Sequence, residues 1–71
     1  MNASYMAGSK AAQALSRVLR LGWGDSPSTY SEAYKMAQEW TETPLGKPSP
    51  QWREGFVSSM AGFGYPLEES S

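Results

Sequence analysis

The alternation of apolar and polar positions predicts a helix most clearly between residues 29 and 43. Apolar side chains recur there at intervals of three and four residues, the spacing of one face of an α-helix. These positions are Tyr30, Ala33, Tyr34, Ala37 and Trp40. Thr29 and Glu32 match a capping box at the start, and Pro44 disfavours helical geometry in the residue before it. We expect the apolar face of this helix to be the central wall of the core.

A second helical pattern covers residues 4–21, with Ser4 or Asn2 as N-cap and Gly22 as the C-terminal stop. Most of its apolar positions are small, and Gly8 among them allows a neighbouring helix to approach closely. The core positions expected from this segment are Ala11, Leu15 and Val18.

A third pattern covers residues 50–62, where Ser49 is a candidate N-cap and Pro50 suits the first helical position. Its expected core positions are Trp52, Phe56 and Met60. Gly62, Gly64 and Pro66 are predicted to end the helix, and residues 67–71 to form a frayed polar tail. The sequence therefore predicts an all-α fold, with residues 1–71 forming a single three-helix bundle with short Gly- and Pro-rich connections.

Composition narrows the chemistry of these 71 residues, because the chain has no cysteine and no histidine. The commonest general base, the thiol nucleophile and the usual zinc ligands are therefore missing. We predict a non-enzymatic protein without a catalytic, cofactor or metal site. No segment has the roughly 20 apolar residues that a membrane helix needs, and no signal peptide is recognisable. The prediction for localisation is the cytoplasm, with no membrane partner.

The basic residues of the first helical segment form a pattern of their own. Lys10, Arg17 and Arg20 share one helical face with Gln13, and all seven acidic residues lie after position 24. Two interpretations stay open, a solvated helix face or a contact surface for phosphate groups or an acidic partner. Trp23 stands between two glycines, where it either covers the core as a lid or projects as an interface anchor.

Two fragments resemble a known family. Gln51-Trp52-x-x-Gly55-Phe56-x-x-x-Met60-Ala61 resembles the second helix of the bacterial ribosome modulation factor, and Tyr5-x-Ala7-Gly8 is similar to the start of its first helix. The resemblance implies binding to the small ribosomal subunit, with Tyr5, Gly8, Trp52 and Gly55 serving helix packing. This chain carries an additional predicted helix between the two fragments, and its net charge of −1 contrasts with that strongly basic family.

Three functional hypotheses follow. The first is a protein-binding module that regulates or inhibits a larger protein or complex, including a phage-encoded inhibitor of host or defence machinery. Its candidate partner-binding residues are Trp23, Lys10, Arg17 and Arg20. The second is a nucleic-acid or ribosome-binding protein that uses the same basic residues. The third is a structural homo-oligomer, whose partner is a second copy of the chain.

Overall fold

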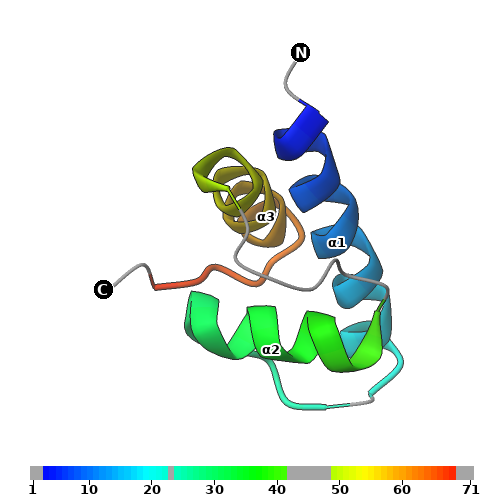
Figure 1. Cartoon of the computed structure of the whole chain (residues 1–71). Helices are drawn as coiled ribbons and strands as arrows, with labels where there is room; N and C mark the ends of the chain where they lie inside the picture. Colours follow the sequence, from blue (N-terminus) through cyan, green and yellow to red (C-terminus); the bar gives the residue numbers. More distant parts are fainter. Residues whose placement is uncertain (1–2, 23, 42–48, 69–71) are drawn as a thin grey trace.

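The computed structural model describes residues 3–22, 24–41 and 49–68, and it confirms an all-α fold. The helices within these residues are α1 (Ala3–Arg20), α2 (Tyr30–Trp40) and α3 (Pro50–Gly62). Figure 1 shows α1 and α3 packed against each other, with α2 lying beneath α3 and the C-terminal half of α1. The three predicted helices are therefore present, although two of them differ from the predicted bounds.

Helix α1 ends at Arg20, one residue before the predicted end, and Gly22 is its predicted stop. Gly22 has a φ of +81°, and its N–H donates to the carbonyl oxygen of Leu19 at 3.0 Å, which closes the helix in the left-handed conformation that suits glycine. Ser4 lies inside the helix, so its prediction as N-cap is wrong. The alternative cap, Asn2, lies outside the described residues.

Helix α2 begins at its predicted cap and ends three residues early. The backbone N–H of Glu32 donates to the Thr29 hydroxyl oxygen at 3.2 Å. In return the Glu32 carboxylate accepts from Ser28, at 3.0 Å from the backbone N–H and 3.3 Å from the hydroxyl. These hydrogen bonds hold the pKa of Glu32 below its ordinary value. At the other end Thr41 is extended, and both its N–H and its hydroxyl donate to the Ala37 carbonyl, so the helix stops at Trp40.

Helix α3 has the predicted bounds because both of its ends carry local signals. The Ser49 hydroxyl accepts the Trp52 N–H at 3.2 Å, and Pro50 occupies the first turn. At the C-terminus Gly64 has a φ of +96°. The Gly64 N–H donates to Ala61 and the Tyr65 N–H to Met60, at 3.1 and 2.8 Å, which is the Schellman arrangement.

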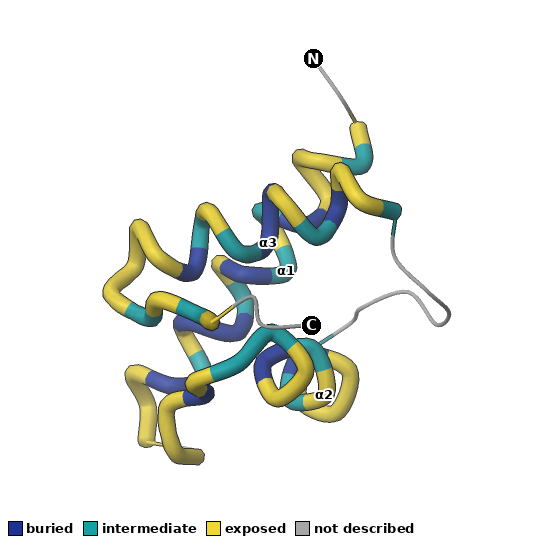
Figure 2. Tube along the Cα trace, turned by 90° about the vertical axis from the view of Figure 1, so that its left-hand side faces the viewer, coloured by how far each residue is buried: buried dark blue, intermediate teal, exposed yellow. Residues whose placement is uncertain are grey.

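The most extensive contact in the fold joins α1 and α3, whose backbones touch at two glycines. A Cβ atom placed on Gly8 would collide with the carbonyl oxygen of Trp52, and one placed on Gly55 would collide with the carbonyl oxygen of Tyr5. The close approach expected at Gly8 is thus confirmed, and Gly55 is its counterpart on α3. Figure 2 shows the two helices side by side with buried positions along their junction.

The buried face of α1 differs from the predicted one. Its buried positions are Gly8, Ala12, Leu15, Ser16 and Leu19. Leu15 is buried as predicted, but Ala11 and Val18 are only half-buried, so the predicted stripe is rotated about the helix axis to one side of the true interface. The contact with α3 is centred on Gly8, and alanines on either side of that line look alike in a hydrophobic pattern.

Helix α2 contributes less to the core than predicted. Ala33 and Ala37 are fully buried, but Trp40 remains 44% exposed, so its assignment to the core is wrong. Tyr30 and Tyr34 are half-buried and pack edge-on against the rings of α3, which are stacked on each other at 5.0 Å. The predicted core residues of α3 are all buried; they are Trp52, Phe56 and Met60. The centre of the core is therefore the α1–α3 junction, and α2 closes one side of it.

The segment after α3 folds back onto the start of α2. Leu67 packs against the core, and the Glu68 N–H donates to the Ser28 carbonyl at 2.9 Å while its carbonyl accepts the Tyr30 N–H at 3.4 Å. These bonds form an isolated parallel bridge between Thr29 and Glu68. The prediction of a frayed tail is therefore wrong for residues 67 and 68, and residues 69–71 lie outside the described part.

We predict that Tyr30→Phe will stabilise the protein slightly. The Tyr30 hydroxyl is buried, and no described residue is its hydrogen-bond partner. Removing an unsatisfied polar atom gains about 1 kcal/mol. The Arg53 guanidinium, 4.5 Å above the ring centre, keeps its cation–π contact with phenylalanine. Urea unfolding of Tyr30→Phe beside Tyr34→Phe tests this, and a loss above about 0.5 kcal/mol at Tyr30 would contradict it.

We also expect the stability of the natural chain and of Tyr30→Phe to depend differently on alkaline pH. Burial raises the pKa of Tyr30 to about 12. Between pH 10 and 12 the unfolded chain releases this proton while the folded chain holds it, so stability falls as pH rises. The free energy of unfolding should therefore fall less between pH 10 and 12 in Tyr30→Phe than in the natural chain.

Candidate functional site

A row of basic residues lies on the exposed side of α1, opposite the contact with α3. Lys10, Arg17 and Arg20 are all exposed, and so is Gln13 between them. The structure therefore brings the three predicted basic site residues onto one face. No described residue forms an ion pair with any of the three, so the positive charge of this face is uncompensated within the described part of the chain.

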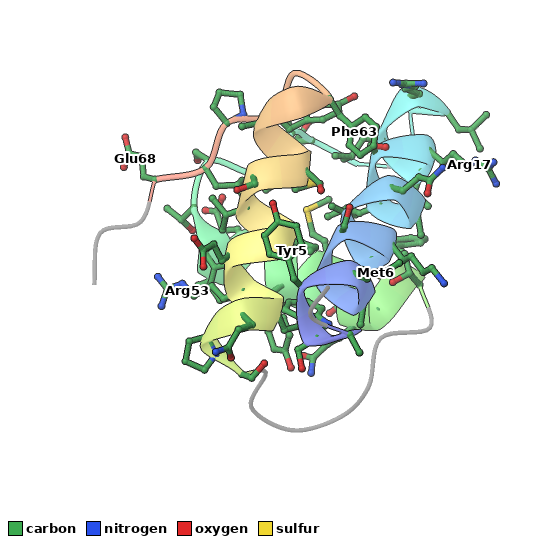
Figure 3. The ribbon with its side chains drawn as sticks, turned by 90° about the horizontal axis from the view of Figure 1, so that it is seen from above. Tyr5, Met6, Arg17, Arg53, Phe63 and Glu68 are labelled. Carbon is green, nitrogen blue, oxygen red and sulfur yellow. The ribbon has the colours of Figure 1, made fainter. Side chains whose placement is uncertain are left out.

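Two large apolar side chains that the sequence prediction missed share this face. Met6 is 43% exposed and Leu21 is 74% exposed. Met6 precedes Lys10 by four residues within α1. Leu21 follows the last residue of the helix, and its N–H donates to the Arg17 carbonyl at 3.2 Å, which places it on the side of Arg17. Figure 3 shows Met6 and Arg17 on the outer side of α1. We call the set Met6, Lys10, Gln13, Arg17, Arg20 and Leu21 the α1 basic face.

The edge of this face is extended by the C-terminal cap of α3. Phe63 is 36% exposed, and the Arg20 guanidinium lies 6.0 Å from its ring centre, at the outer limit of a cation–π contact. Figure 3 shows Phe63 between the C-terminal ends of α1 and α3. Halfway along the face, at its edge, the half-buried Ala14 shares an open depression with Lys10, Gln13 and Arg17.

Part of this charge has a purely structural explanation. Arg17 and Arg20 lie in the last turn of α1, where positive charge interacts favourably with the negative end of the helix dipole. Lys10 lies in the middle of the helix and gains nothing from that effect. Lys10 is therefore the residue that distinguishes a binding face from a stabilised helix end.

The remaining predicted site residue cannot be placed on this face. Trp23 lies outside the described residues, so its interpretations as lid and as anchor both stay predictions.

A second open depression lies along α2 and has the opposite charge. Asp25, Glu32 and Glu39 line it together with Lys35 and the half-buried Met36. The described residues contain no cluster of acidic side chains arranged to hold a metal ion. The strongest pKa shift among them is that of Tyr30, whose buried hydroxyl opens onto none of these depressions. None of the described helices has the length and apolar character needed to cross a bilayer.

Comparison with protein-family models, with curated proteins and with solved structures found no match. The resemblance to the ribosome modulation factor therefore stays a prediction. Of the four residues to which the resemblance assigns helix packing, Gly8 and Gly55 lie at the α1–α3 contact and Trp52 is buried, whereas the Tyr5 side chain is 38% exposed and its backbone carbonyl lies against Gly55.

Proposed function

We propose that this protein is a non-enzymatic binding module that uses the α1 basic face to contact an acidic surface of a partner protein. One observation carries the proposal: uncompensated cations and large exposed apolar side chains share the same helix face. A small module of this kind acts by occupying a surface of a larger protein, as a regulator or inhibitor does. A phage-encoded inhibitor of host or defence machinery is one form of such a regulator.

The free energies available from this face favour a protein partner over a nucleic acid. Exposed ion pairs contribute about 0.2–1 kcal/mol each, whereas association costs at least about 4 kcal/mol in lost freedom of motion. Three cations alone therefore do not hold a partner. Burying an exposed methionine or leucine side chain adds up to about 1.5–3 kcal/mol. A phosphate backbone offers little apolar surface to Met6 and Leu21, but a protein surface does.

Affinity capture with a matched pair of variants tests the proposal. The immobilised natural chain is exposed to bacterial lysate beside Lys10→Glu/Gln13→Glu, which reverses the charge in the middle of the face but keeps both arginines of the last turn. Lys35→Glu is the control, because Lys35 is exposed on α2, away from this face. We expect a stoichiometric protein to be retained by the natural chain and the control but lost from the double variant.

Two results would overturn this function. Equal capture by the double variant would show that the α1 basic face is not used, provided that thermal unfolding confirms that all three chains are folded. Capture of RNA or DNA instead of protein would support the nucleic-acid alternative. With three phosphate contacts, the logarithm of that affinity should fall with the logarithm of salt concentration with a slope of about −2.7 on duplex DNA.

A further inference from the structure

The α1 basic face is long and narrow, and its apolar members lie near its two ends. At a rise of 1.5 Å per residue, Met6 and Leu21 are separated by roughly 22 Å along the helix axis. Lys10, Gln13 and Arg17 occupy the stretch between them. Because all of these side chains are exposed, a partner that covers both ends at once must be elongated to a similar length.

Halfway along its length, the face borders a shallow depression of the kind into which another helix can pack. Ala14 is small and half-buried, and the longer side chains of Lys10, Gln13 and Arg17 line the same open depression beside it. Helices pack by setting a ridge of side chains from one into a groove of the other. A depression over a small residue accepts such a ridge, while the neighbouring cations reach past it.

We propose that the α1 basic face docks an acidic amphipathic helix of the partner protein, laid along α1. This inference rests on the proposed function and names the chemistry of its partner. The uncompensated charges at Lys10, Arg17 and Arg20 are complementary to carboxylates that recur every three or four residues along one side of a helix. Met6 near one end, and Leu21 with Phe63 at the other, are complementary to apolar residues at the two ends of that row.

Two synthetic peptides of identical composition and charge test the shape of the occupant. The first places glutamates on one helical face with leucines at its two ends, and the second distributes the same residues around the helix. Each is titrated into the full chain labelled with ¹⁵N. We expect the first peptide to bind at least tenfold more tightly, with chemical shift changes confined to α1 and the neighbourhood of Phe63.

Variants then measure separately what the apolar ends and the charges of the face contribute to peptide affinity. Met6→Ala/Leu21→Ala should weaken the first peptide about tenfold, and Lys10→Glu/Gln13→Glu should abolish its binding. The Lys35→Glu control should leave its affinity unchanged. Equal binding of the two peptides, or no binding of the first up to about 1 mM, would overturn the inference. So would a duplex oligonucleotide that binds this face more tightly than the first peptide.

The two proposals fail in different ways. If lysate protein is captured through Lys10 and Gln13 while the peptides are not distinguished, the proposed function stands and the helical occupant is wrong. If no protein is captured, the proposed function itself is wrong, whatever the peptides do.

Discussion

Substituting either glycine of the α1–α3 contact with alanine is expected to remove a large share of the protein's stability. The new methyl group of Gly8→Ala would overlap the Trp52 carbonyl oxygen and would lie 2.9 Å from the Phe56 nitrogen. In Gly55→Ala it would overlap the carbonyl group of Tyr5. These obstacles are backbone atoms, which cannot rotate away as a side chain can, so the helices must separate.

The expected loss is large for a chain of this size. Overpacking a core costs about 1–3 kcal/mol of stability and occasionally more. Because these two helices carry most of the core, we expect the cost of separating them to be about 3 kcal/mol or more. A domain of 71 residues has roughly 4–10 kcal/mol of stability in total. Urea unfolding followed by circular dichroism should show a much lower midpoint, or no folded baseline, for each variant.

The other glycine of α3, Gly62, provides the control. A Cβ atom on Gly62 would have no atom within 4 Å, and Gly62 is the last residue of α3. Alanine has a higher helix propensity than glycine by up to about 1 kcal/mol. Gly62→Ala should therefore be neutral or slightly stabilising. If Gly8→Ala and Gly55→Ala changed stability as little as Gly62→Ala, the backbone contact between α1 and α3 would be contradicted.

The parts of the fold that could be predicted depend on local signals. Ser49 and Pro50 at one end of α3, and Gly64 at the other, act through their own backbone geometry and nearest neighbours. The end of α2 was predicted three residues too late, because Thr41 competes for the Ala37 carbonyl before the proline is reached. The register of α1 could not be predicted, since it depends on which small residue meets the backbone of α3.

The candidate site was only half recognised in the sequence. The spacing of Lys10, Arg17 and Arg20 predicted their common face, and the structure places all three there, exposed. Met6 and Leu21 follow the same spacing, four residues from Lys10 and from Arg17, but spacing alone does not show that an apolar side chain on a helix is exposed. Phe63 could not be placed, because its contact with Arg20 joins two helices that are distant in sequence.

Leu67→Ala should destabilise the protein by about 1–2 kcal/mol and should loosen the start of α2 before the rest of the fold. Leu67 is half-buried against the core, so it contributes part of the 1.5–3 kcal/mol that complete burial of a leucine provides. The bridge next to it also links Glu68 to Ser28 and Tyr30. Leu21→Ala is the matched control, because Leu21 is 74% exposed and its removal should change stability by less than about 0.5 kcal/mol.

Amide hydrogen exchange locates the effect within the molecule. In Leu67→Ala the amides of Tyr30 and Glu68 should exchange faster, because their bridge loses the apolar contact beside it. The amides in the middle of α3 should keep nearly the same protection from exchange as in the natural chain. Uniform loss of protection across all three helices would contradict this local role. It would mean that the segment after α3 belongs to the same cooperative unit as the α1–α3 contact, and that α2 cannot loosen without the rest of the protein.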